Sequence, residues 1–198
     1  MKKYELTSET KIIDGVELHR IKALNSFGNI EKGELGGWIE SEENLSQDGD
    51  AWVYDNATVG DNATVGGHAT VVGNATVRGD ATVCKNVIVS GNAIVSGNAM
   101  VFENATVEDN AKVDGNAVVC GNAKVRGKED YIIFKNWWSS GRYFTWTRSN
   151  NKWMVGCFYG SGEELIAKAY KDSEKSGREY ERVVKYVESI LKEENNNK

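Results

Sequence analysis

The sequence contains few of the residues that most often build metal sites and disulfide frameworks: three cysteines and two histidines in 198 residues. The cysteines lack the close spacing of a zinc site or a disulfide scaffold, so we expect free thiols. A catalytic zinc needs three protein ligands, whereas His19 and His68 lie far apart with no cysteine or carboxylate cluster beside them. We therefore expect no metal and no cofactor.

Long apolar runs are also absent. No segment has the charged start and apolar stretch of a signal peptide, and none approaches the length of a membrane span. We therefore expect a cytoplasmic protein that does not bind a membrane. The net charge of −5 hides a local asymmetry, because residues 131–162 contain four basic residues and no acidic one.

A six-residue repeat fills the middle of the chain. From Ala51 to Ala123 a small residue recurs at every sixth position, and a valine stands two places after each one. Residues two apart share one face of a strand, so the small residue and the valine point the same way. Gly-Asn and Gly-Asp pairs, which tolerate positive φ, then turn the chain at many of the corners. This period predicts a parallel β-helix.

The words Val59–Thr64 and Val95–Met100 resemble the motif of the hexapeptide-repeat superfamily: an aliphatic residue, a small or acidic one, two variable positions, and a small residue followed by one more. The resemblance implies a left-handed helix with three hexads per coil, and hence about four coils.

The flanks of the repeat predict a mainly β protein of three parts. Residues 1–44 form a β-rich cap in which Asp14-Gly15 turns a hairpin, residues 45–127 form the β-helix, and residues 128–198 form a small α+β module. In the module we expect three strands, Tyr131–Phe134, Tyr143–Thr147 and Trp153–Phe158, followed by two helices with capping boxes that begin at Ser161 and Ser176.

Of the three outer faces of the β-helix, one presents only apolar groups on two adjacent coils. Such a patch is typical of an interface. We expect it to bind sister subunits, with a homotrimer favoured, or to receive the C-terminal module. The interface residues predicted are Cys84, Met100, Phe102, Val118 and Cys120.

Many hexapeptide-repeat proteins are acyl-CoA-dependent acyltransferases, and the resemblance implies a histidine base with acyl-CoA bound between neighbouring subunits. Only His68 lies on the β-helix, at a corner position that is Asn or Asp elsewhere in the repeat. The hexads also run without the inserted loop that such enzymes commonly carry. An acyltransferase using His68 is therefore the alternative hypothesis.

The most unusual non-repetitive segment interleaves four of the six tryptophans with the four basic residues of 131–162. Aromatic faces stack on nucleobases, and Arg or Lys contacts phosphate. Gly160-Ser161-Gly162 then leads into a helix N-terminus, where backbone amides can hold an anion. The segment predicts binding of a nucleotide, a nucleic acid, another anionic small molecule or a protein, although a buried aromatic core would also account for part of it. The candidate residues are Lys135, Trp137, Trp138, Arg142, Tyr143, Trp146, Arg148, Lys152 and Trp153.

Gly36-Gly37-Trp38, Asp50–Asp55 and Asn136–Trp146 also resemble segments of uncharacterised hexapeptide-repeat proteins of bacteria and bacteriophages. The sequence thus favours a non-enzymatic binding protein, an oligomeric β-helix that displays an aromatic and basic module. The phage resemblance implies interference with a host process in the host cytoplasm, by sequestering a nucleotide-like ligand or by binding a host protein.

Overall fold

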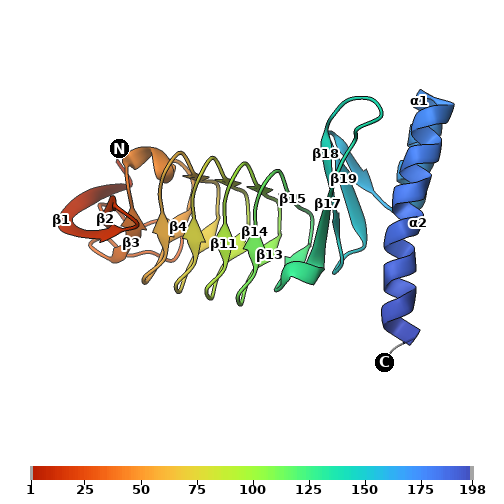
Figure 1. Cartoon of the computed structure of the whole chain (residues 1–198). Helices are drawn as coiled ribbons and strands as arrows, with labels where there is room; N and C mark the ends of the chain where they lie inside the picture. Colours follow the sequence, from red (N-terminus) through yellow and green to blue (C-terminus); the bar gives the residue numbers. More distant parts are fainter. Residues whose placement is uncertain (1, 197–198) are drawn as a thin grey trace. The chain divides into compact units, whose positions relative to one another are not determined.

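The computed structural model describes residues 2–196 of the chain, which forms two compact units. The first unit extends to Ile132 and also includes Thr147–Asn150. The second unit contains Ile133–Trp146 and the residues from Asn151 onward. The first unit holds the six-residue repeats, and the second holds the helices (Figure 1).

The repeats fold into a left-handed β-helix of about five turns, as the six-residue period predicts (Figure 1). Each short strand pairs in parallel with the strand 18 residues further on, as Thr58 does with Thr76 and Thr76 with Ile94. The strands are β4 (Trp52–Val53), β5 (Thr58–Val59), β6 (Thr64–Val65), β7 (Thr70–Val71), β8 (Thr76–Val77), β9 (Thr82–Val83), β10 (Ile88–Val89), β11 (Ile94–Val95), β12 (Met100–Val101), β13 (Thr106–Val107), β14 (Lys112–Val113), β15 (Val118–Val119) and β16 (Lys124–Val125).

These strands form three sheets, one along each side of the coils. Sheet 1 has the order β1-β2-β3-β5-β8-β11-β14, sheet 2 the order β16-β13-β10-β7-β4, and sheet 3 the order β15-β12-β9-β6. The alanine and valine of each hexad are fully buried inside the coil, and the residue between them faces outward. This alternation explains why small residues recur, since three strands meet in each narrow coil.

The corners of the coils depend on backbone with positive φ. Gly97, for example, has φ +66°, and a Cβ atom there would lie 2.9 Å from the backbone nitrogen of Gly115 in the next coil. Next to these positions the asparagines form hydrogen-bonded ladders between coils. Asn74 Nδ2 donates to Asn92 Oδ1 at 3.2 Å, and Asn92 Nδ2 donates to Asn110 Oδ1 at 3.1 Å. The Gly-Asn pattern therefore satisfies both the turn and the polar groups beside it.

The first turn of the solenoid begins before the regular hexads. Strand β3 (Leu35–Ile39) pairs in parallel with β5, and Leu45 forms a parallel bridge with Val65. The 3₁₀ helix η1 (Glu42–Asn44) lies between them. The expectation of about four coils is therefore corrected to about five, because segments without the full repeat motif continue the ladder.

The N-terminal segment forms the expected hairpin. Strands β1 (Tyr4–Ile13) and β2 (Val16–Ala23) are antiparallel, and β2 continues into sheet 1 through β3. Asp14 and Gly15 have φ +51° and +85°, which confirms the predicted hairpin turn.

Side chains from outside the repeats satisfy the backbone at both ends of the solenoid. At the first turn the Tyr4 hydroxyl donates to the carbonyl of Leu45 at 2.6 Å, and Lys3 Nζ donates to that of Ala51 at 3.0 Å. At the last turn the Tyr131 hydroxyl donates to the Lys112 carbonyl at 3.0 Å, and Ser149 Oγ accepts from the backbone nitrogen of Lys124 at 2.7 Å. The solenoid therefore does not present a bare strand edge at these positions. The 3₁₀ helix η2 (Lys128–Asp130) precedes this closing segment.

The antiparallel sheet that follows has the order β17-β18-β19-β20. The expected third strand, Trp153–Phe158, is in fact two strands, because Gly156 with φ +58° turns the chain. The strands are β17 (Tyr131–Lys135), β18 (Tyr143–Thr147), β19 (Lys152–Val155) and β20 (Phe158–Gly160).

Two helices, α1 (Gly162–Asp172) and α2 (Glu174–Asn196), pack against each other. The capping box at Ser161 is confirmed: its side chain accepts from the backbone of Glu164, and the Glu164 carboxylate accepts from the backbone of Ser161. The predicted start of the second helix at Ser176 is wrong. The helix begins at Glu174, and Ser173 Oγ accepts from the backbone of Ser176 at 3.1 Å. Tyr180, Val184 and Val187 are buried on one face of α2.

Candidate functional site

The buried side chain of Asn136 holds the loop between β17 and β18 in place through hydrogen bonds at its base. Its Nδ2 donates to the Tyr180 hydroxyl at 3.1 Å. Its Oδ1 accepts from the backbone nitrogen and the hydroxyl of Ser139, at 2.9 and 3.0 Å. The backbone nitrogen of Asn136 donates to the carbonyl of Arg142 at 2.7 Å, which closes the base of the loop. Gly141, with φ +68°, supplies the final turn. The loop is therefore a defined structure.

Two neighbouring tryptophans on this loop have opposite environments. Trp138 is buried, and its ring lies 5.1 Å from that of Tyr180 in an edge-on arrangement. Trp137 is 74% exposed and touches the edge of Trp138, with 6.1 Å between the ring centroids. An indole left this open to solvent is unusual for an ordered loop, because large apolar groups are stabilised by burial.

Basic and aromatic side chains flank Trp137 in the loop and at the strand ends. Lys135 at the end of β17 is exposed, and its Nζ lies 5.5 Å from the centre of the Tyr143 ring. Arg142 and Tyr143 at the start of β18 are exposed as well. Neither Lys135 nor Arg142 forms an ion pair with any residue in the range 2–196. We call Lys135, Trp137, Arg142 and Tyr143 the aromatic-basic surface.

The other predicted binding residues lie elsewhere. Trp138, Trp146 and Trp153 are buried side chains of the second unit, with Trp153 packed 6.0 Å from Phe144. They therefore belong to the aromatic core and cannot stack on a ligand without rearrangement. Trp146 also donates through Nε1 to Asn151 Oδ1 at 2.9 Å. Lys152 is half-buried.

Arg148 belongs to the first unit. It is half-buried, and its Nε donates to the backbone carbonyl of Glu129 at 2.9 Å. Four of the nine predicted residues are thus exposed in the loop or at the strand ends beside it. Sequence reasoning alone could not separate exposed from buried tryptophans, since the two kinds are adjacent at Trp137-Trp138.

The helix N-terminus after Gly160 binds an anion from within the chain. The Glu164 carboxylate accepts from the backbone nitrogen of Ser161 at 2.7 Å, and this contact lowers the pKa of Glu164. A Cβ atom on Gly162 would lie 2.6 Å from Val184, so this glycine serves close helix packing. The predicted anion-binding role of this turn is therefore taken by the protein itself.

A small polar cavity that the sequence did not reveal lies beside the loop. Its volume is about 260 Å³. Ser139 and Arg142 from the loop and Lys168 and Asp172 from α1 contribute to its lining, with Tyr180 from α2. Basic and acidic groups both line it, so it has no single charge preference.

The predicted oligomer face corresponds to sheet 3. Met100 is 45% exposed and pairs directly with Val118 of the next coil. Phe102 is half-buried, with Lys85 Nζ 5.6 Å from its ring centre. Cys84 is half-buried and Cys120 fully buried, and burial raises the pKa of both thiols, that of Cys120 to about 12. Of the five predicted residues, Met100 is therefore exposed, and Cys84, Phe102 and Val118 are half-buried.

His68, the candidate base of the alternative hypothesis, lies at a solenoid corner. Its Nδ1 lies 3.2 Å from a carboxylate oxygen of Asp50, which occupies the equivalent position one coil earlier. The imidazole is 60% exposed. The pair continues the ladder formed elsewhere by asparagines, and it also has the arrangement of a carboxylate that orients an imidazole.

Other kinds of site receive no support from the described residues. Within residues 2–196, no group of three or more His, Cys, Asp or Glu side chains is placed to hold a metal ion. None of the helices in that range combines the length and apolar character that a membrane crossing requires.

Comparison with known proteins gives one informative similarity. No protein-family model matches the chain. The chain is 34% identical over 67 residues to the uncharacterized acetyltransferase YdcK of Escherichia coli (strain K12). This match covers 30% of the chain and 21% of the length of the bacterial protein, so the chain corresponds to only about a fifth of that relative.

Proposed function

We propose that this hexapeptide-repeat β-helix protein is a non-enzymatic binding protein whose aromatic-basic surface binds an acidic surface of a partner protein. The observation that carries the proposal is the 74% exposure of Trp137, which lies in the sequence between two exposed cations without ion pairs, Lys135 and Arg142. Exposed Trp, Tyr and Arg are the residues that most often dominate the binding energy of protein interfaces. Uncompensated positive charge in a chain of net charge −5 favours an anionic partner.

A protein partner fits this surface better than a nucleotide does. Trp137 is carried on a loop, and the neighbouring cavity of about 260 Å³ is smaller than the range of roughly 300–1,000 Å³ typical of small-molecule sites. An exposed indole can instead fill a pocket on a partner, as anchor residues do.

The scaffold contributes by multiplying this surface. Hexapeptide-repeat β-helices commonly form oligomers, and the exposed apolar groups of sheet 3 provide a contact for sister subunits. A homotrimer would carry three copies of the aromatic-basic surface, and linked copies raise the apparent affinity for a multivalent partner. The sequence resemblance to phage proteins makes a host protein the partner that we propose, with binding in the host cytoplasm.

The test compares partner capture by three forms of the full chain. The site variant carries Lys135→Gln, Trp137→Ala and Arg142→Gln. The control variant carries Ile88→Ala and Lys124→Gln, which remove an exposed apolar group and an exposed lysine from sheet 2. A photo-crosslinker at position 139 identifies proteins that contact the loop. We expect the wild type and the control to crosslink the same acidic protein, and the site variant to lose it without a change in melting temperature.

Two results would contradict the proposal. One is equal crosslinking by the site variant and the wild type. The other is saturable binding of ATP or a short oligonucleotide that requires Trp137 and displaces the protein, which would identify a nucleotide as the ligand.

An acyltransferase is the second candidate function, and the contact between His68 and Asp50 favours it. With Nδ1 held by the carboxylate, the exposed imidazole could use Nε2 to remove a proton from an acceptor hydroxyl or amine as that group attacks a thioester carbonyl. The C–S bond then breaks, and the leaving thiolate takes the proton back from Nε2. The name of the bacterial relative is consistent with this chemistry. His68 lines neither of two cavities in the described residues, of about 260 and 630 Å³, so we rank this function second.

A further inference from the structure

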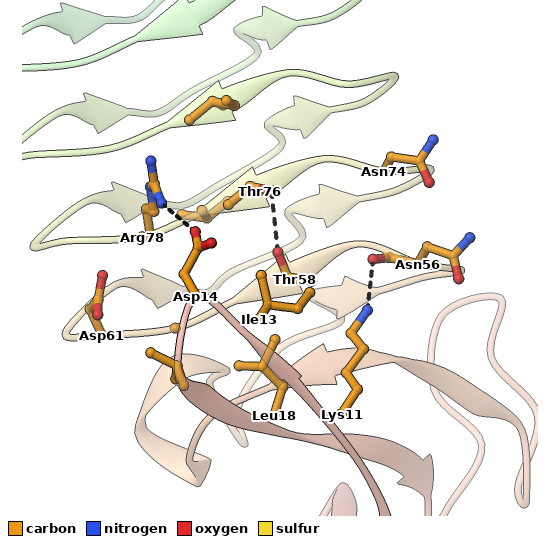
Figure 2. A pocket seen from close by; sticks show the side chains of 14 residues that line it. Lys11, Ile13, Asp14, Leu18, Asn56, Thr58, Asp61, Asn74, Thr76 and Arg78 are labelled. Carbon is orange, nitrogen blue, oxygen red and sulfur yellow. Dashed lines mark hydrogen bonds and ion pairs between the residues drawn. The ribbon is translucent and has the colours of Figure 1, made fainter.

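A second cavity, of about 630 Å³, lies between the β1–β2 hairpin and the outward side chains of β5, β8 and β11 of the same sheet (Figure 2). Ile13, Val16 and Leu18 of the hairpin line one side. The opposite side is formed by the outward residues of successive coils, among them Thr76 and Ile94. We call this cavity the hairpin groove. Its volume lies within the range typical of small-molecule sites, and its lining is mainly apolar in the middle.

An ion pair holds the hairpin tip to the solenoid at one end of the groove. Asp14 in the hairpin turn pairs with Arg78, 64 residues further along the chain, at 3.4 Å (Figure 2). Both side chains are largely exposed, so the pair contributes little to stability by itself. The pair does neutralise the charge of Arg78. Arg78 is therefore a less suitable partner for an anionic ligand.

Lys11 is the second cation of the groove and, unlike Arg78, is partly buried without an ion pair. Its Nζ lies 3.5 Å from the backbone carbonyl oxygen of Asn56 (Figure 2). The same atom lies 4.5 Å from the centre of the Trp38 ring. Lys11 is half-buried and forms no ion pair with any other described residue. Burial, followed by the nearby charge of Arg20, lowers the pKa of Lys11. A partly desolvated ammonium without a carboxylate is unfavourable, and an anion that paired with it would relieve this cost.

The floor of the groove suits an apolar chain. Thr58 and Thr76, which both line the groove, bond to each other through their hydroxyls at 3.2 Å, so these polar groups already have a partner. Ile94 continues the row on the next coil, and Ile13 is 40% exposed on the hairpin side. Covering these groups with an alkyl or aryl chain would remove apolar surface from water.

We infer that the hairpin groove binds a small amphipathic carboxylate, whose head pairs with Lys11 and whose apolar tail lies between Ile13 and the row formed by Thr58, Thr76 and Ile94. The proposal is independent of the aromatic-basic surface, since the groove belongs wholly to the first unit. The same chemistry occurs in free medium-chain fatty acids and in acyl chains at a lipid surface, and the experiment distinguishes these sources.

The probe is sodium decanoate, titrated calorimetrically into the full chain. We expect saturable binding with one site per chain. Lys11→Gln should weaken it by about tenfold or more, because a charge-assisted contact is lost, and Lys11→Arg should restore most of the affinity. Thr76→Phe should block binding by filling the floor while its side chain points away from the solenoid interior. The control variant, Lys124→Gln on sheet 2, should bind like the wild type.

Two further experiments test whether the protein recognises the charge of the ligand and whether the ligand is a free acid or a lipid surface. Decanol, which lacks the charge, should bind the wild type more weakly than decanoate does, and Lys11→Gln should abolish this preference. Phosphatidylglycerol vesicles should not sediment with bound protein. If the wild type sediments with the vesicles and the Lys11→Gln variant stays in solution, the ligand is a lipid surface. The free-acid form of the proposal is then wrong. Decanoate binding that is absent, or that is unchanged in both Lys11→Gln and correctly folded Thr76→Phe, overturns it.

Discussion

The side-chain amide of Asn136 donates to the hydroxyl of Tyr180 at 3.1 Å, and both side chains are buried. The bond joins the base of the loop that carries Trp137 to the middle of helix α2. Tyr180 in turn packs its ring against Trp138 and Phe144. The geometry of the exposed indole therefore depends on a polar contact within the aromatic core of the second unit.

Removing this contact should destabilise the second unit. Tyr180→Phe leaves Asn136 Nδ2 without its partner, and we expect a loss of about 1–2 kcal/mol in the free energy of unfolding. Asn136→Ala also removes the contacts with Ser139, so it should cost more and weaken partner binding through the loop. Urea denaturation, followed by tryptophan fluorescence, measures the free energy of unfolding of both variants, and the crosslinking experiment measures partner binding. Tyr186→Phe, at a position 57% exposed, is the matched control and should change neither.

Self-association should depend on the apolar face of sheet 3. Met100→Lys with Val118→Lys places two charges where a subunit contact is expected, and burying them would be costly. Light scattering should then report a smaller oligomer than the wild type forms. Ile88→Lys is the control, since Ile88 is 44% exposed on sheet 2 and Met100 is 45% exposed on sheet 3. An unchanged mass for the double variant, or an equal effect of the control, would show that sheet 3 is not the interface.

His68→Asn should leave the fold and partner binding intact, because asparagine occupies the equivalent corner of other coils and forms the same kind of ladder. Thermal unfolding should shift by no more than a few degrees. If the wild type releases free CoA from acetyl-CoA with an acceptor and the folded variant does not, then the acyltransferase becomes the preferred function. Asp50→Asn should in that case reduce the rate as well.

Stability should rise with pH through the titration of Lys3. Burial lowers the pKa of this amine from about 10.5 to about 8, although Asp50 and Asp48 oppose the shift. Between these values the unfolded chain binds more protons than the folded one, so the penalty is complete below pH 8 and disappears toward pH 10.5. Between pH 8 and 10 the free energy of unfolding of the wild type should therefore rise relative to that of the Lys3→Met variant. Parallel pH profiles in urea denaturation would show that Lys3 does not titrate in this range.

Gly97→Ala should destabilise the solenoid by about 2 kcal/mol, because Gly97 has φ +66° and the added Cβ would lie 2.9 Å from the backbone of Gly115. Gly66→Ala is the control within the same repeat: its φ lies outside the left-handed region, and the nearest atom to its added Cβ, on Ser46, is 3.5 Å away. Circular dichroism melting curves of the two variants should differ by several degrees. Equal melting temperatures would contradict the close approach of the coils at Gly97.

The repeat predicts the solenoid almost completely, because each Ala-x-Val word states which side chains point inward and each Gly-Asn pair states where the chain turns. The extra turn does not follow from the repeat, because Trp38-Ile39 and Leu45 pair with residues 20 positions further along the chain, as Ile39 does with Val59, and not 18. In the second unit, Gly156 divides the expected third strand, and a glycine within an apolar run does not by itself indicate a hairpin.

Composition located the aromatic-basic segment but could not resolve it. Trp137 and Trp138 have identical chemistry, and only the fixed loop, with Asn136 beneath it, determines which of them is exposed. The hairpin groove left still less trace in the sequence. It combines Lys11 with residues such as Ile94, more than 80 positions away, so it exists only after the hairpin reaches the coils.

Side chains from outside the repeats close both ends of the solenoid. A whole coil can therefore be removed or added between the ends without changing these closing contacts. Deleting or duplicating 18 residues between Asn74 and Asn110 would keep Tyr4 and Lys3 on the first turn and Tyr131 and Ser149 on the last, while every ladder re-forms one rung shorter or longer. The solenoid could thus change in steps of about 4.8 Å, the spacing between paired strands. Variation among natural relatives of this chain should accordingly fall on whole multiples of 18 residues, with the end segments carried along unchanged.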